Sequence, residues 1–173
     1  MREMRTGSLM QVIVMGVSGA GKSYLAGKLV EATGWAFAEG DDYHSAENKA
    51  RMAARIPLTD AEREPWLNAL HAVLLGWEQS GTNGIMTCSA LKATYRERLA
   101  AGLPGVRFVW LDPTRKLLEE RLAHRKGHYM PAGLLDSQMA TLEPPIDDPR
   151  VLRLDGAESA EDEVKIVLAW LRD

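Results

Sequence analysis

The sequence predicts a three-layer α/β fold, in which helices cover both faces of one parallel sheet of five strands. Short apolar runs, each bordered by Gly, Pro or Asp, alternate along the chain with longer stretches of helical periodicity. Successive strands are separated by enough residues for the helical crossovers that parallel strands need. The length of 173 residues is that of one domain. We therefore expect a single domain over residues 1–173, opened by a flexible leader over residues 1–9.

The individual elements follow from these patterns in chain order. Strands are expected at residues 11–15, 35–38, 85–88, 106–111 and 151–154, and helices at 22–33, about 45–54, 60–80, 92–101, 114–126, 131–140 and 158–171. Gly34 supplies the stop for the first helix. Thr59 and Glu62 have the spacing of a capping box at the start of the third helix, which can hold Pro65 only in its first turn.

Composition narrows the class of partner. Lysine and arginine number 21 and aspartate and glutamate 24, and the resulting net charge of −3 argues against a protein that coats nucleic acid or an anionic membrane. No run of apolar residues approaches the roughly 18 that a membrane span needs. The single cysteine, Cys88, excludes an intrachain disulfide and favours a reducing compartment. We therefore expect a cytoplasmic protein whose partner is a small molecule.

A glycine-rich segment between the first strand and the first helix predicts a phosphate site. Residues 16–23, GVSGAGKS, fit the pattern GxxxxGK[ST]. In such a loop, backbone N–H groups and the helix N-terminus face the phosphates, the lysine reaches the β and γ phosphates, and the serine hydroxyl binds Mg²⁺. The residues expected to bind the nucleotide are Gly16, Ser18, Gly19, Ala20, Gly21, Lys22, Ser23 and Tyr24, with Ser23 also the metal ligand. The alternative is a glycine turn with a surface lysine.

Two further comparisons favour a small kinase among the users of nucleoside triphosphates. A guanine-reading Asn-Lys-x-Asp is missing, because the one similar stretch, residues 48–51, ends in Arg51. The expected strand 85–88 ends in Cys88 and Ser89 and not in the aspartate of motor and transport ATPases. In a small kinase an acceptor hydroxyl, and not water, attacks the γ phosphate.

An acidic cluster at the end of the second strand is the candidate acceptor site. In a parallel sheet of this kind the strand's carboxyl end faces the same crevice as the first loop. Asp41 could accept or orient the acceptor's proton, and Glu39 or Asp41 could contact Mg²⁺ through water. The alternative interpretation is a solvated acidic turn.

Basic residues concentrate in residues 115–128 of a chain that is acidic overall. Arg121 and Arg125 lie one helical turn apart and share a face. With Gly127 as a hinge, they predict a mobile lid over about residues 121–133 that clamps phosphate. For Arg115 and Lys116 a solvated basic face is the alternative.

Three sequence blocks beyond the phosphate loop resemble one known family. These are GDDYHSAENKARMAARIPLTDAEREPWL at residues 40–67, CSALKATYR at 88–96 and RKGHYMPAGLLDSQMATLEPP at 125–145. They are similar to blocks of the gluconate kinases, small P-loop kinases related to shikimate and adenylate kinases. The resemblance implies the P-loop kinase fold, ATP-dependent phosphorylation of the 6-hydroxyl of D-gluconate, and ATP and Mg²⁺ as cofactors. It also implies a homodimer.

The resemblance also implies roles for single residues. Lys22, Asp41 and Arg125 become the catalytic group, with Asp41 as the base for the acceptor hydroxyl. The residues implied to bind the sugar acid are Asp41, His44, Arg63, Lys92, Arg96 and, from the lid, His128, while Arg121 would stack on adenine or touch phosphate. Trp66 suggests either stacking on the sugar or an aromatic anchor of the core. Gln138 and the turn at 142–145 would support the lid.

Three departures from the family pattern bear on the acceptor. Ser45 stands in place of Pro, Arg51 in place of Lys, and Arg55 in place of Gly. Arg55 either adds a cation at the acceptor site or points to solvent. The alternative functions are another small sugar-acid or shikimate-type kinase and, from a different class, a nucleotide-gated binding module. Such a module would lack the acceptor carboxylate, whereas Asp41 is present.

Overall fold

The computed structural model of the chain describes residues 9–124 and 132–173. The expected leader, apart from Leu9, and the middle of the expected lid therefore lie outside the described residues. The strands are β1 Gln11–Met15, β2 Ala36–Glu39, β3 Gly84–Thr87, β4 Val106–Leu111 and β5 Val151–Leu154. The helices are α1 Lys22–Thr33, η1 Gly40–Tyr43, α2 Ala46–Ala53, α3 Asp60–Ser80, α4 Ala93–Ala100, α5 Arg115–Ala123, α6 Ala132–Thr141 and α7 Ala160–Arg172.

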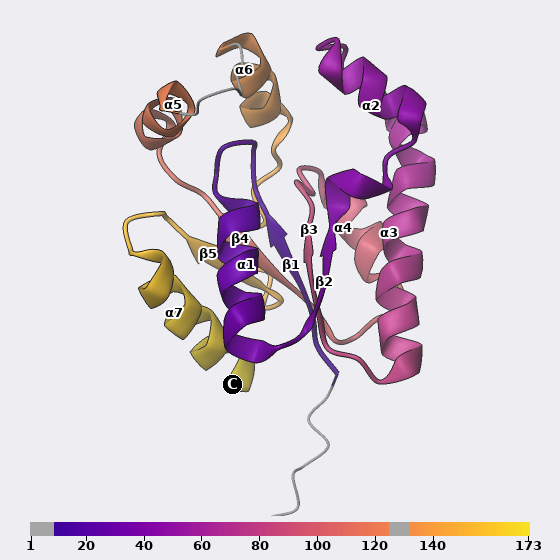
Figure 1. The fold of residues 1–173 in the computed structure, drawn as a ribbon, viewed down its shortest axis with the longest axis vertical. Helices are drawn as coiled ribbons and strands as arrows, with labels where there is room; N and C mark the ends of the chain where they lie inside the picture. Colours follow the sequence, from indigo (N-terminus) through magenta and orange to yellow (C-terminus); the bar gives the residue numbers. More distant parts are fainter. Residues whose placement is uncertain (1–8, 125–131) are drawn as a thin grey trace, which may run out of the picture.

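The five strands form one parallel sheet in the order β2-β3-β1-β4-β5 (Figure 1). The central strand β1 pairs with β3 on one side, where Val12 faces Ile85, and with β4 on the other, where Val12 faces Arg107. The chain therefore builds the sheet to one side of β1 first and then crosses to the other. Ligands bind at such a reversal, outside the carboxyl ends of the strands.

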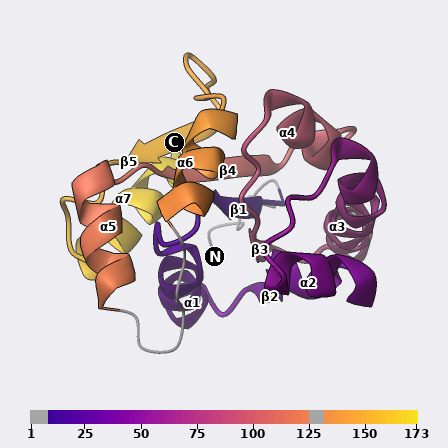
Figure 2. The ribbon, with the colours of Figure 1, turned by 90° about the horizontal axis from the view of Figure 1, so that it is seen from above.

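Helices cover both faces of the sheet, as the sequence predicts. Alternate residues of β1 enter two separate cores, since Ile13 packs with residues of α3 and α4, whereas Val14 packs with residues of α1 and α7. At the carboxyl edge of the sheet, α2 and α6 stand on opposite sides (Figures 1 and 2). This edge is where a site can form.

Two local features differ from the expected elements. The acidic cluster after β2 is a single ordered turn of 3₁₀ helix, η1. The Thr59–Glu62 capping box is present at the start of α3, but Pro65 lies in the second turn of that helix, so the prediction that it must occupy the first turn is wrong. Trp66 and Leu67, which follow it directly, are 4% and 1% exposed. The capping box and the burial of these two side chains offset the free-energy cost of the hydrogen bond that proline cannot make.

Within the described ranges, no helix combines the length and the apolar character needed to cross a membrane.

Candidate active site

The loop between β1 and α1 has the geometry of a phosphate cradle. Gly16 has φ +143°, and a Cβ atom there would lie 2.6 Å from the Leu111 carbonyl oxygen, so only glycine fits. Gly21 forms the N-cap of α1 without any side-chain cap, and the first turn of α1 contains no acidic residue. The N–H groups at this helix start are therefore left for a ligand, and the helix dipole favours an anion there.

Lys22 lies folded over the same loop. Its Nζ donates hydrogen bonds to the carbonyl oxygens of Gly16 at 2.9 Å and Val17 at 3.1 Å. Lys22 also lines the first of the two cavities described below. The ammonium group is thus held at the boundary between the loop and the crevice.

The next residue, Ser23, meets the end of β2. Its hydroxyl donates to the Glu39 carboxylate, with both oxygens at 3.0 Å. Among the described residues, no three His, Cys, Asp or Glu side chains are grouped to hold a metal. Mg²⁺ does not need such a group, because it usually keeps several waters and takes one or two protein oxygens together with substrate phosphates. The oxygen donors of Ser23 and Glu39 fit such an ion.

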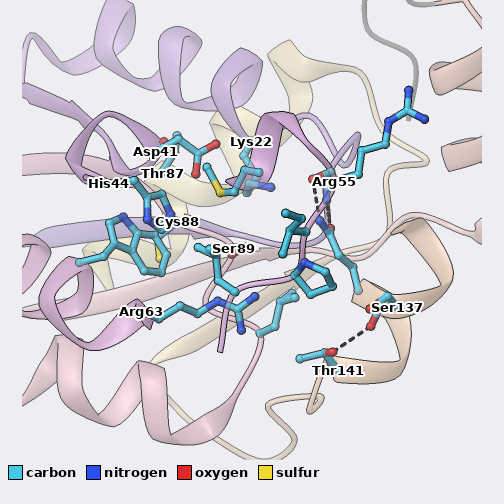
Figure 3. A pocket seen from close by; sticks show the side chains of 18 of the residues that line it. Lys22, Asp41, His44, Arg55, Arg63, Thr87, Cys88, Ser89, Ser137 and Thr141 are labelled. Atoms are coloured by element: carbon cyan, nitrogen blue, oxygen red, sulfur yellow. Dashed lines mark hydrogen bonds between the residues drawn. The ribbon is translucent and has the colours of Figure 1, made fainter. Parts of the chain in front are cut away.

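A cavity of about 230 Å³ opens beside the loop, at the carboxyl ends of β2 and β3 (Figure 3). Five of the predicted site residues meet there: Ser18, Lys22, Asp41, His44 and Arg63. Met52 and residues 55–58 also line the cavity, as do Ser137, Gln138 and Thr141 of α6. The cavity thus combines a carboxylate at the end of β2 with cations from two other elements.

His44 and Trp66 form the back of this cavity. Their rings are stacked, with centroids 4.2 Å apart, and the indole Nε1 donates to the Gly40 carbonyl oxygen at 2.8 Å. Trp66 is therefore the core anchor that the sequence analysis weighed against sugar stacking. Burial lowers the pKa of His44, with Asp41 opposing and Arg63 adding to the effect. The imidazole is neutral near neutral pH, and its buried Nδ1 has no hydrogen-bond partner among the described residues.

Arg63 reaches the cavity from α3 and is held from behind by Tyr95. Its Nη1 donates to the Tyr95 hydroxyl at 3.0 Å, and this hydroxyl donates a short hydrogen bond to the Asp60 carboxylate. Lys92 donates to the same carboxylate at 2.9 Å and is not among the residues that line the cavity. The hydrogen bonds from Tyr95 and then Lys92 lower the pKa of Asp60. Lys92 Nζ also lies 5.6 Å from the centroid of the Tyr95 ring, so Tyr95, which sequence reasoning missed, lies between Lys92 and Arg63.

Arg96 does not reach the cavity either. It is 6% exposed, and its guanidinium donates to the carbonyl oxygens of Ala90 at 2.7 Å, Leu91 at 3.2 Å and Glu143 at 2.7 Å. It thereby joins the segment after β3 to the turn at 142–145. Ala90 has φ +48°, and Arg96 supports this left-handed residue.

Residues on either side of segment 125–131 contact the phosphate loop. Arg121 donates to the Ala20 carbonyl oxygen at 3.0 Å. Gln138 accepts from the Ser18 backbone N–H at 2.7 Å and donates to the Ser18 hydroxyl at 3.0 Å. Gln138 is thus a direct contact of the loop, which its expected role as a lid support did not include. Arg125 and His128 lie outside the described residues.

Comparison with known proteins adds independent information. The family described as AAA domain matches residues 12–145. A gluconokinase of Gluconobacter oxydans is 46% identical over 145 residues, which are 84% of this chain and 82% of that protein. This chain belongs to the gluconokinase family.

Solved structures agree with this assignment. The structure of a gluconokinase from Sinorhizobium meliloti has a TM-score of 0.86 at 41% identity, covering 95% of this chain and 93% of that one. A sugar kinase from Janibacter has a TM-score of 0.89 at 44% identity, covering 95% of both chains. The P-loop kinase fold expected from the gluconokinase resemblance is confirmed.

The structure accounts for the departures from the gluconokinase pattern. The Ser45 hydroxyl caps α2 by accepting from the Asn48 N–H at 3.0 Å. Arg51 forms ion pairs within α2 and with Glu62 of α3. Arg55 has φ +63° and follows the C-cap of α2, a position that favours glycine. Arg55 is one of the residues that line the cavity, but it is exposed, and its guanidinium extends away from Asp41 and His44 (Figure 3).

A second cavity, of about 340 Å³, lies on the other side of the gluconokinase phosphate loop. It is lined by Gly19, Ala20, Gly21, Tyr24, Leu25, Leu111, Arg121, Glu158, Ala160 and Glu163. Tyr24 and Arg121, both predicted to bind the nucleotide, therefore lie here and not in the first cavity. Tyr24 could be predicted because it directly follows the GxxxxGK[ST] motif, whereas no sequence pattern indicated Glu163.

Proposed function

We propose that this protein transfers the γ-phosphoryl group of ATP to the 6-hydroxyl of D-gluconate, giving 6-phosphogluconate and ADP. The observation that carries the proposal is the shared boundary of the phosphate cradle and the first cavity. Lys22 belongs to both, and Asp41 lines the same cavity close to Lys22 (Figure 3). A γ phosphate held by the loop would therefore face an acceptor in the cavity.

The chain's own residues would bind the triphosphate through the loop. The uncapped start of α1 supplies N–H groups to the phosphates, and Lys22 exchanges its two carbonyl partners for phosphate oxygens. We propose that Ser23 and Glu39 hold Mg²⁺, which when bound neutralises charge on the phosphates. Arg121, next to the loop, stabilises the nucleotide from the α5 side.

The first cavity would bind the sugar acid. The acceptor oxygen attacks the γ phosphorus, the bond to the β–γ bridging oxygen breaks, and the hydroxyl proton passes to Asp41. Arg63 and neutral His44 offer hydrogen bonds for the carboxylate and hydroxyls of gluconate. Lys92 supports Arg63 through Asp60 and Tyr95, while Arg96 supports the adjoining wall. Arg125 and His128 remain proposed lid ligands.

We further propose that the enzyme works as a homodimer in the cytoplasm and uses neither nucleic acid nor membrane as a partner. The family resemblance supports the dimer. The net charge of −3 and the small cavities support a small anionic substrate held by local cations.

A coupled ADP-release assay over gluconate, shikimate, glycerate and nucleoside monophosphates tests the proposal. We expect ADP release that depends on gluconate and is absent with the other acceptors. Turnover with shikimate but not gluconate would assign the protein to another small-acid kinase. ADP release without any acceptor would support the nucleotide-gated module.

A further inference from the structure

The second cavity lies where the nucleoside part of a bound nucleotide must extend. The phosphate loop separates the two cavities, since Ser18 and Lys22 line the first and Gly19 to Gly21 line the second. If the γ phosphate faces the first cavity, the other end of the nucleotide points into the second. Its volume of about 340 Å³ is in the range of small-ligand sites.

Glu163 is an unusual residue in the wall of this cavity. It lies in the first turn of α7 and is only 9% exposed. Its Oε2 is buried and has no hydrogen-bond partner among the described residues. A buried polar atom without a partner costs free energy, and rotation of the carboxyl group toward the cavity that Glu163 lines would let a ligand group pair with it.

We propose that the Glu163 carboxyl group reads the base of the nucleotide, accepting a hydrogen bond from the 6-amino group of adenine and donating one to ring N1. This inference rests on the proposed function, because it requires ATP at the phosphate loop. It makes Glu163 a specificity-determining residue on α7, on the far side of the loop from the acceptor.

The environment of Glu163 favours the neutral acid that this pairing needs. Burial raises the pKa of its carboxyl group; Asp155 and Glu158 raise it further, while Arg121 of α5 opposes them. Tyr24 of α1 is the other titratable residue lining the cavity. A protonated carboxyl has one donor and one acceptor, which matches the N1 and 6-amino edge of adenine. Guanine presents two donors at the corresponding edge and would pair with the ionised carboxylate instead.

The first test compares equilibrium binding of ATP and of purine riboside triphosphate, which lacks the 6-amino group, in the absence of any acceptor. We expect the wild type to bind ATP about tenfold more tightly, the size of one hydrogen bond in a buried site. Glu163→Ala should remove this preference. Glu161→Gln, which changes an exposed carboxylate in the same turn of α7, serves as the matched control and should keep it.

The second test follows the ratio of ATP to GTP affinity with pH. In the wild type the ratio should fall as pH rises through the pKa of Glu163, because ionisation removes the donor to adenine N1. Glu163→Gln carries a permanent donor and acceptor and should give a ratio independent of pH. This variant nearly preserves the side-chain shape, so it remains informative if Glu163→Ala does not fold.

Two results would overturn the inference. One is that Glu163→Ala keeps the wild-type preference for ATP over purine riboside triphosphate. The other is that the ATP/GTP affinity ratio of Glu163→Gln depends on pH as it does in the wild type. If wild type binds ATP and phosphorylates gluconate while these results are obtained, only the role of Glu163 fails. If wild type does not bind ATP at all, the proposed function fails with it.

Discussion

The two sides of the crevice are built in different ways. The phosphate cradle is made mostly of backbone from residues 16–23, a single stretch of chain. The acceptor cavity is made of side chains from the continuous β2–η1 segment, from α3 and from α6, three regions that lie far apart in sequence. Substitutions in the cradle should therefore affect every acceptor alike, whereas those in the cavity should affect binding or transfer of one acceptor.

The largest expected effect is on transfer. Asp41→Asn keeps the shape of the side chain but removes the proton acceptor, so kcat with gluconate should fall roughly a thousandfold. ATP affinity, measured by equilibrium binding, should stay within about twofold, because Asp41 does not belong to the cradle. Near-wild-type turnover would refute the assigned role.

A substitution in the phosphate cradle should affect every acceptor equally, unlike one in the acceptor cavity. Lys22→Ala removes the cation between the loop and the cavity, and we expect kcat/KM to drop by about 10²–10³ for any accepted substrate. The ratio of kcat/KM between two acceptors should not change. A selective loss for one acceptor would show that the two sides of the crevice are not separable.

The support behind Arg63 should have an intermediate effect. Tyr95→Phe removes the hydroxyl that holds the guanidinium, so the KM for gluconate should rise about tenfold while the KM for ATP stays constant. In an Arg63→Ala background the same change should add nothing, because the group it positions is gone. Additive effects in this double-mutant cycle would mean that Tyr95 acts on something other than Arg63.

The smallest effects concern the stability of the α2 wall. Ser45→Ala removes the cap of α2 and should lower the free energy of unfolding by about 1 kcal/mol. Arg55→Gly should raise it by about 0.5 kcal/mol, because glycine adopts the left-handed conformation without steric cost. Arg55→Ala, which keeps a Cβ atom, is the control and should give no such gain. Urea denaturation measures all three.

The difference between the two sides also explains what the sequence could predict. The cradle and the five strands could be predicted because short patterns determine local backbone, and GVSGAGKS is one such pattern. The assignment of Lys92 and Arg96 to direct substrate contact was harder, since a cation in a matching block looks the same whether it faces a ligand or a carbonyl oxygen. The burial of Arg96 and the ion pair between Lys92 and Asp60 depend on tertiary packing.

Glu163 and Tyr95 could not be predicted from the sequence, again because their roles depend on tertiary packing. Their positions follow from how α7 packs against α1 and how α4 packs against α3, and no local pattern marks them. Pro65 shows that a local rule yields to tertiary packing where a capped helix start and two buried side chains hold the helix around it.

The most direct test of the central claim is to identify the product. Phosphorus NMR of the purified protein with ATP, Mg²⁺ and D-gluconate should show one new phosphate monoester on the 6-oxygen, formed in step with ADP. Asp41→Asn should form this ester roughly a thousandfold more slowly. Inorganic phosphate in place of the ester, or an ester on another oxygen, would contradict an acceptor cavity that presents the 6-hydroxyl to the γ phosphate.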